Sequence, residues 1–368
     1  MSQAGFDVQE ATIDGIHAAM QSGALTCRAL VEEYLRRIEA YDRRGPNLNA
    51  IQSLNSRALD EADALDAELR RSGPRGPLHG IPVAIKDQVE VLGMPTTYGS
   101  ALFRGFVPKR DATVVQRIKA AGGIVLAKTN MGEFAAGYAG SAYGVCRNPY
   151  DPARDPSGSS SGSGVAVSAN MAAVAVGEDT FGSVRGPAAR NCIVGLRPTL
   201  PLVSRFGMMP ATPTRDTLGP LARTVRDAAL LLDVMAGYDP NDPITASSVG
   251  HVPATYTSFL TRGALPDVRV GVIRDALATD TDPQAEDYQR IRDVIDRALR
   301  DLAGLGVDVV DPLAIPGILD LMADMEGTFE SEEATNAYLA AHPDAPARTL
   351  RDIVLSPQVL PYRRARLV

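Results

Sequence analysis

The chain has 368 residues, of which 45% are hydrophobic, and its formal net charge is -7 at pH 7. Such a composition supplies enough apolar side chains for a core, which excludes disorder as the default. The acidic balance argues against direct binding of nucleic acid, because that kind of surface needs clustered lysine and arginine.

Cysteine usage and the N-terminal residues indicate the compartment. Cys27, Cys146 and Cys192 are widely spaced and odd in number, which fits a reducing compartment better than a disulfide framework. The chain starts with acidic residues where a secretory signal is basic and then apolar, and no apolar run approaches the ~20 residues of a membrane span. We therefore expect a cytoplasmic protein. No cysteine or histidine spacing is typical of zinc, so we expect no metal and no cofactor.

Two amphipathic helices are predicted first. Thr26 is a suitable N-cap for a helix with an apolar stripe over 30–41, and Asn55 for a second helix with a stripe over 59–69. Both carry many charges on the opposite face, which indicates that they lie on the outside of the fold.

A strand, a helix and a second strand follow. Residues 81–86 predict a short strand, Asp111 is a suitable N-cap for the helix, and 124–128 predict the second strand. This order favours a parallel crossover. Lys86 ends the first strand. Because lysine is rarely buried unless it is paired or used in chemistry, a catalytic lysine and a snorkelling surface lysine are equal alternatives at this point.

The segment 155–185 combines two clusters of serine and glycine with a short apolar run between them. A Ser/Gly loop alone is usually a flexible linker, but here it opens into residues 163–176, which are apolar nearly all round. This pattern predicts a buried central helix followed by a strand into Gly177.

The rest of the chain shows weaker patterns. We expect a strand at 193–196, a proline-punctuated loop at 208–221 and a helix at 225–236 capped by Thr224. A loop rich in proline, aspartate and serine follows, and it gives the best candidate for a subdomain boundary, near 239–265. The elements expected beyond it are a strand at 268–273, a helix at 282–303, a strand at 307–310 and weak helices from 316 onward.

Three side chains can be tested as a catalytic set: Lys86, Ser159 and Ser183. Nucleophilic attack on an acyl carbon needs an activated hydroxyl, a proton acceptor and donors for the oxyanion. Histidine is the usual acceptor, but His79 fits a polar loop residue better, and no Gly-x-Ser-x-Gly elbow is present. A neutral lysine can take the proton if burial lowers its pKa, and Ser-Lys sets are a known variant of this logic.

Five short motifs follow one another along the chain. They are His79-Gly-Ile-Pro-Val-Ala-Ile-Lys-Asp87, Asn148-Pro-Tyr-Asp151, Gly158-Ser-Ser160, Asp179-Thr-Phe-Gly-Ser-Val-Arg185 and Gly195-Leu-Arg-Pro-Thr199. In this order they resemble the motifs of the amidase signature hydrolases. The resemblance covers about 30–237 and implies one α/β domain over 1–368 with a core signature at 76–237. It implies a mixed, largely parallel central sheet covered by helices on both faces, and a C-terminal part shorter than usual.

The resemblance also implies roles for residues that match the family's motifs. Ser183 resembles the nucleophile, Ser159 the serine after a cis peptide bond with Gly158, and Lys86 the terminal base. The implied relay passes a proton from Ser183 to Ser159 and on to neutral Lys86. The amides expected to hold the oxyanion are those of Thr180, Phe181, Gly182 and Ser183. The residues expected to support the site are Asp179, Arg185 and Ser160, with Ser161 nearby.

The sequence departs from the family's usual pattern at several positions. Ser157 and Ser161 stand where the family usually has glycine, and Phe181 stands where it usually has glycine before Gly182. If position 181 needed a positive φ, phenylalanine would cost roughly 1–2 kcal/mol there. Its ring would also lie beside the oxyanion hole and narrow the acyl pocket.

The expected activity is hydrolysis of a small, linear, non-peptide amide to an acid and ammonia or an amine, through an ester of Ser183. The first alternative is a glutaminase that resembles the glutamine-hydrolysing component of glutamyl-tRNA amidotransferase, its A-type polypeptide. The second is an inactive or truncated pseudoenzyme, motivated by Phe181 and the early C-terminus. The expected partner is a small-molecule amide, with no nucleic acid bound directly and no membrane, and a homodimer is left open.

Overall fold

The computed structural model describes residues 6–261, 263, 265, 267–274, 282–323 and 330–367. The chain divides into two compact units. The larger unit comprises Met1–Thr257 together with Glu330–Val368, and the smaller unit comprises Ser258–Phe329. The single domain expected over 1–368, with a boundary near 239–265, stays a prediction.

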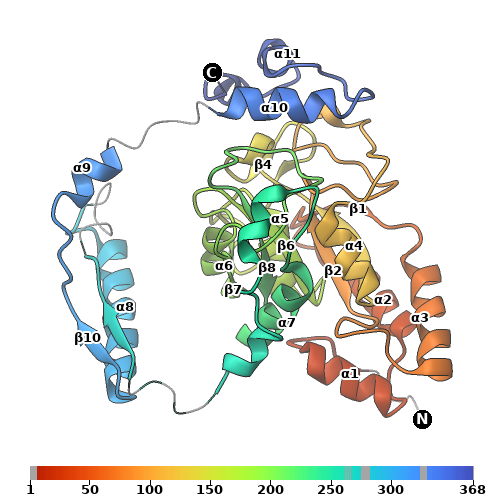
Figure 1. Ribbon diagram of the computed structural model, residues 1–368, viewed down its shortest axis with the longest axis horizontal. Coiled ribbons are helices and arrows are strands. Elements are labelled where there is room, and N and C mark those ends of the chain that lie inside the picture. Colours follow the sequence, from red (N-terminus) through yellow and green to blue (C-terminus); the bar gives the residue numbers. More distant parts are fainter. Residues whose placement is uncertain are drawn as a thin grey trace. The chain divides into compact units, whose positions relative to one another are not determined.

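A six-stranded mixed sheet forms the centre of the larger unit, with the strand order β1-β3-β2-β6-β8-β7 (Figure 1). In chain order the strands are β1 (Ile51–Leu54), β2 (Pro82–Lys86), β3 (Ile124–Thr129), β6 (Val174–Asp179), β7 (Val194–Gly195) and β8 (Thr217–Ala222). Strand β2 pairs in parallel with β3 and β6, whereas β1 and β8 are antiparallel to their neighbours. Four of the six strands therefore run in one direction, which confirms the predicted mixed, largely parallel sheet.

Helices cover this sheet. Those of the N-terminal part are α1 (Ile13–Gln21), α2 (Cys27–Arg37), α3 (Ala58–Ser72), α4 (Thr113–Ala120), α5 (Ser161–Ser168), α6 (Arg185–Arg190) and α7 (Val225–Met235). Helix α5 packs against β2, β3, β6 and β8, while α4 packs on β3 and α7 on β8. Helix α5 is buried over Ser161–Val167. The predicted central helix followed by a strand is therefore confirmed, with β6 as the strand.

Two of the predicted N-caps are confirmed. The Thr26 hydroxyl accepts from the Ala29 amide at the start of α2, and the Thr224 hydroxyl accepts from the Asp227 amide at the start of α7. Each bond satisfies an amide that the first helical turn leaves without an intrahelical partner.

The other two predicted N-caps are wrong. Helix α3 begins after Arg57 and α4 begins after Ala112, and neither residue caps its helix with a side chain. The Asn55 amide group instead donates to the Val125 carbonyl. The Asp111 carboxylate lies one residue too early and accepts from Leu92 and Lys119. Contacts with Val125 and Leu92, which lie outside these helices, thus hold both side chains in positions other than the predicted caps.

Strand β8 was predicted as loop because Pro220 interrupts it. Proline lacks the N–H that a strand interior needs. The Pro220 carbonyl accepts from the Leu196 amide on the β7 side, so its nitrogen faces the same side. There β7 ends at Gly195, so the missing donor falls at the end of the β7–β8 ladder and not in its interior.

The smaller unit contains a strand, a helix and a parallel strand. Strand β9 (Arg269–Gly271) pairs in parallel with β10 (Asp308–Val310), and α8 (Glu286–Gly304) connects them. Helix α9 (Ile318–Ala323) follows. The predicted strand, helix and strand are confirmed, although the helix begins four residues later than Asp282.

The C-terminal segment returns to the larger unit as α10 (Ser331–Ala340), α11 (Leu350–Leu355) and α12 (Pro361–Arg364). Leu339 and Ile353 of this segment share a hydrophobic cluster with Tyr98, Phe103 and Phe106, which come from the first third of the chain. None of the helices in the described ranges combines the length and apolarity that crossing a bilayer requires.

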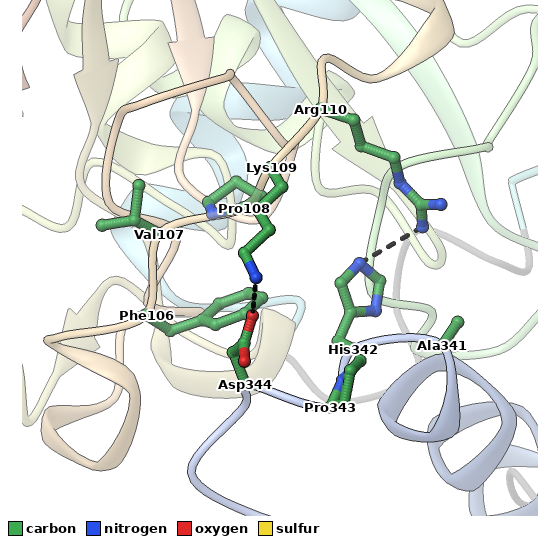
Figure 2. A pocket seen from close by; sticks show the side chains of 9 residues that line it. All are labelled: Phe106, Val107, Pro108, Lys109, Arg110, Ala341, His342, Pro343 and Asp344. Carbon is green, nitrogen blue, oxygen red and sulfur yellow. Dashed lines mark hydrogen bonds and ion pairs between the residues drawn. The ribbon is translucent and has the colours of Figure 1, made fainter.

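A shallow pocket lies where this segment meets the loop 106–110 (Figure 2). Lys109 forms an ion pair with Asp344 across it, and the Arg110 guanidinium contacts the His342 ring. The buried Glu90 carboxylate binds both Arg110 and His342. These charged contacts fix the C-terminal segment to the loop.

Candidate active site

Lys86 lies at the carboxyl end of β2, and its side chain is completely buried. The Nζ atom is 2.8 Å from the Ser159 hydroxyl, 3.0 Å from Oε2 of Glu178 and 3.3 Å from the Glu178 carbonyl oxygen. An ammonium group has three hydrogens, so these three acceptors satisfy it completely. The snorkelling alternative is excluded, because no part of the side chain reaches solvent.

The charge on Lys86 depends on opposing effects. Burial lowers its pKa, because the charged form loses its hydration. The carboxylates of Glu178, Asp216 and Asp179 oppose this effect. The net direction is a lowered pKa, which favours a neutral amine at lower pH than for a solvated lysine.

Ser159 follows a cis peptide bond with Gly158 and is buried. A Cβ at position 158 would lie 1.8 Å from the Gly137 carbonyl oxygen, so only glycine fits this close approach of two loops. The next serine, Ser160, donates its hydroxyl to the Glu178 carbonyl at 3.1 Å and accepts from the Glu178 amide at 3.2 Å. Ser160 thus ties the loop to β6 and makes no hydrogen bond to Lys86.

The loop that follows β6 wraps around one buried carboxylate. Asp179 Oδ1 accepts from the Gly182 amide at 2.8 Å and from Arg197 at 3.0 Å, while Oδ2 accepts from the Val184 amide at 3.0 Å and from Arg185 Nε at 3.1 Å. Burial alone would raise the pKa of Asp179, but the bonds from Arg185, Val184 and Gly182 lower it to about 2. The predicted supporting residues Asp179 and Arg185 are therefore in direct contact.

We expect Asp179→Ala to lower the free energy of unfolding by about 3–5 kcal/mol, because it leaves the bound guanidinium and amide donors without their buried acceptor. The pKa of Asp179 is lower in the folded state than in the unfolded chain, so its contribution is present above about pH 4 and lost as pH falls toward 2. Urea unfolding at pH 7 and pH 3 measures both effects. Asp14→Ala, which removes an exposed partner of Arg226, is the control and should cost at most about 1 kcal/mol.

The amides predicted to hold an oxyanion are not equally available. The Gly182 amide donates to Asp179 Oδ1, and its predicted role as an oxyanion donor stays a prediction. Within the described residues, the amides of Phe181 and Ser183 have no hydrogen-bond acceptor. The Thr180 hydroxyl lies between two carboxylates, 2.6 Å from Glu178 and 2.7 Å from Asp216.

Phe181 does not have the positive φ at which its side chain would strain the backbone. The positive φ falls on the next residue, Gly182, at 128°, and Phe181 is not among the described non-glycine residues with positive φ. The Phe181 ring is 56% exposed, and the Arg215 guanidinium lies 4.7 Å from its centroid. Of the serines that replace glycine, Ser157 does have a positive φ, of 62°.

Ser183 lies in the same loop and is partly exposed. No hydrogen bond in the described part of the chain involves its hydroxyl, including any bond to Ser159. The structure therefore brings together Lys86 and Ser159, and it leaves the Ser183 hydroxyl unbound on the loop that begins at the end of β6. His79 lies apart from these residues, and its Nδ1 accepts from the Arg75 amide.

Comparison with known proteins identifies the family. The model of the amidase family matches residues 29–358. The chain belongs to the amidase signature family. It is 44% identical over 265 residues to the A-type polypeptide of glutamyl-tRNA(Gln) amidotransferase from Thermus thermophilus, a match that covers 72% of this chain and 53% of that protein. It is 35% identical to a probable amidase of Arabidopsis thaliana, over 95% of this chain and 68% of that protein. The chain thus spans about half the length of the Thermus relative.

Solved structures of amidase signature proteins share the fold. Native peptide amidase from Stenotrophomonas maltophilia is 38% identical and superposes with a TM-score of 0.89, over 97% of this chain and 75% of that one. This similarity to a peptide amidase contradicts the expectation that the chain acts on non-peptide C–N bonds. The restriction to non-peptide amides was wrong.

Two acidic residues at this candidate site were missed from the sequence: Glu178 and Asp216. Glu178 stands in a run of small and apolar residues on β6, where a carboxylate is rarely buried unless it is paired. The argument that drew attention to Lys86 therefore applied equally to Glu178. Asp216 gave no such signal, because it precedes a strand that was predicted as loop.

Proposed function

We propose that the chain is an amide hydrolase in which Ser183 is the nucleophile, Ser159 the bridging hydroxyl and Lys86 the base. The observation that carries this proposal is the completely buried Lys86 amine 2.8 Å from the Ser159 hydroxyl. A buried lysine beside a serine hydroxyl is costly to maintain without a use. The unbound Ser183 hydroxyl and the free amides of Phe181 and Ser183 on the adjacent loop supply the other parts.

The reaction begins when Ser183 Oγ attacks the amide carbon. Its proton passes to Ser159 Oγ, and the Ser159 proton passes to neutral Lys86 Nζ. The amides of Phe181 and Ser183 donate to the oxyanion of the tetrahedral intermediate. When the intermediate collapses, the C–N bond breaks and the proton returns from Lys86 through Ser159 to the leaving nitrogen. Water then cleaves the Ser183 ester by the same proton path and releases the acid. The Ser183 hydroxyl must come within hydrogen-bond distance of Ser159 for the first step.

The first substrate class to test is the C-terminally amidated peptide, because a peptide amidase shares the fold at 38% identity. The exposed Phe181 ring and the Arg215 guanidinium lie beside the nucleophile loop. They offer an aromatic surface and a positive charge to the part of the substrate that precedes the amide.

A fluorophosphonate probe tests the nucleophile without knowledge of the substrate. We expect stoichiometric labelling of wild-type protein, with the modified peptide containing Ser183, because an activated serine displaces the leaving group on phosphorus. Mass spectrometry after digestion locates the label. Labelling at another serine, or none under conditions that label a known serine hydrolase, contradicts the proposal and favours the inactive alternative.

A second candidate is a glutaminase that supplies ammonia to a partner. The 44% identity to the A-type polypeptide of an amidotransferase favours it. Ammonia release from glutamine and from an amidated peptide, measured side by side, distinguishes the two functions. Release from glutamine that rises when a copurifying protein is added supports the glutaminase, whereas release from the peptide by the chain alone supports the hydrolase.

A further inference from the structure

A continuous row of buried polar atoms extends from Lys86 away from Ser159. Lys86 Nζ is 3.0 Å from Glu178 Oε2, and Glu178 Oε1 is 2.6 Å from the Thr180 hydroxyl. The same hydroxyl is 2.7 Å from Asp216 Oδ1. Lys86, Glu178 and Asp216 are all completely buried. Two carboxyl groups therefore share one hydroxyl behind the amine, in a region that excludes water.

The Thr180 hydroxyl determines how many protons this row holds. A hydroxyl has a single hydrogen, so it can donate to one of the two carboxyl groups only. The other contact is too short for two bare oxygens and is satisfied when that carboxyl carries a proton and donates it to Thr180. The row as built therefore holds one proton between Glu178 and Asp216, in addition to those on Lys86.

Asp216 can hold this proton without the loss of a hydrogen bond. Burial raises its pKa, and the nearby Glu178 carboxylate raises it further. Its other oxygen accepts from the amides of Ala211 and Thr212, both at 2.8 Å. Protonation on the oxygen that faces Thr180 leaves both of these bonds intact. In this arrangement the Glu178 carboxyl group accepts from Thr180 and faces the amine of Lys86.

The position of Glu178 also directs the lone pair of Lys86. When the ammonium loses one proton, two N–H bonds remain, and Glu178 offers two acceptors, its carbonyl oxygen and Oε2. With both hydrogens turned toward Glu178, the lone pair points at Ser159 Oγ, 2.8 Å away. This is the orientation that a base for the Ser159 proton needs.

We propose that Glu178, linked through Thr180 to Asp216, is a positioning residue that aims the Lys86 amine at Ser159 and sets the pH above which that amine can act as the base. The inference rests on the proposed function for its catalytic meaning, but the protonation of Lys86 can be measured without turnover.

The other charged groups around Lys86 are engaged elsewhere. Asp179, next along β6, is bound by two arginines. Asp87, next along β2, accepts from the Thr97 amide and hydroxyl. Lys128, on β3, donates to the Asp87 carbonyl. Glu178 is therefore the acidic side chain with a direct contact to the amine.

Glu178→Gln is the variant that tests this role with the least change in shape. The amide oxygen of the new side chain can accept from Lys86, and its NH2 group can donate to Thr180, which then donates to Asp216. Every contact in the row is thereby satisfied, and the negative charge moves from the residue in contact with the amine to Asp216, on the far side of Thr180. Glu32→Gln, which neutralises an exposed partner of Arg28, is the matched control.

The experiment is an NMR titration of protein labelled with ¹³C at the lysine Cε, whose shift reports the charge on Nζ. The Lys86 signal is assigned by its loss in Lys86→Met. Removal of the Glu178 charge should lower the midpoint of Lys86 by about 1–3 pH units, and Glu32→Gln should leave it in place. In the pH profile of kcat/KM, the acidic limb should move to lower pH by the same amount. The value of kcat should fall less in Glu178→Gln than in Lys86→Met.

An unchanged Lys86 midpoint in Glu178→Gln overturns the inference while leaving the proposed function intact. A wild-type protein without serine-dependent activity overturns the proposed function, and the titration still decides the role of Glu178. If Glu178→Gln does not fold, Asp216→Asn decides the question. Its amide can donate to Thr180, so Glu178 stays ionised and the Lys86 midpoint should not fall. If the Lys86 midpoint falls by one pH unit or more in Asp216→Asn, the charge that controls the protonation of Lys86 lies on Asp216, and the inference is contradicted.

Discussion

Ser183→Ala should reduce amide hydrolysis by about 10⁴-fold or more, because it removes the atom that forms the ester while the rest of the site remains. The Ser183 hydroxyl makes no hydrogen bond within the described residues, so the free energy of unfolding should change by less than about 0.5 kcal/mol. Initial rates with an amidated peptide and with glutamine, together with thermal unfolding, measure the two effects.

Ser72→Ala is the control for this experiment. Ser72 ends α3 and is exposed, and within the described residues its hydroxyl bonds only to the Glu68 carbonyl, so its removal should leave the rate unchanged. Wild-type rates in Ser183→Ala would show that another group attacks the amide, and the proposed mechanism would then be wrong. A loss of folding in Ser183→Ala would contradict the observation that the hydroxyl is unbound.

Removal of Lys86 should have the second largest effect, a loss of about 10³- to 10⁴-fold in kcat/KM, because Ser159 then has no acceptor for its proton. Lys86→Met alone also leaves the buried Glu178 carboxylate unpaired, which destabilises a protein by about 3–5 kcal/mol. The double variant Lys86→Met with Glu178→Gln avoids that unpaired charge. Rates should be normalised to the folded fraction, measured by circular dichroism.

Lys128→Met is the matched control for Lys86. Lys128 lies on the neighbouring strand β3, is completely buried, and burial lowers its pKa to about 8. Its Nζ donates to the Asp87 carbonyl, the Pro95 carbonyl and the Thr96 hydroxyl, so its contacts are structural. Activity per folded molecule should therefore survive in Lys128→Met. Equal losses in the two lysine variants would show that the Lys86 effect is a general consequence of losing a buried cation.

The parallel centre of the sheet was predictable because local signals coincided there. The strands β2 and β3 are short and apolar and begin just after a glycine, and the amphipathic helix α4 between them ends just before Gly122. Their order fixes a parallel crossover. Strand β8 was missed because the tolerance of Pro220 depends on where β7 ends, which is a tertiary fact. The N-caps at Asn55 and Asp111 failed for the same kind of reason.

The site was predictable in its residues and less so in its electrostatics. Motif positions singled out Lys86 and Ser159, and these two side chains are in contact. The charge state of Lys86 could not be predicted, because it depends on Glu178 from a neighbouring strand and on Asp216 from a loop that carried no signal. The engagement of the Gly182 amide with Asp179 likewise follows from the path of the loop in space.

The return of residues 330–367 to the larger unit has a consequence for how the protein is made. Tyr98, Phe103 and Phe106 leave the ribosome early, but the side chains that cover them, Leu339 and Ile353, are synthesised more than 200 residues later. Until then this aromatic surface is open to other chains, and exposed apolar surface of this kind promotes aggregation during synthesis. The larger unit therefore completes its second hydrophobic cluster only after the smaller unit has been translated.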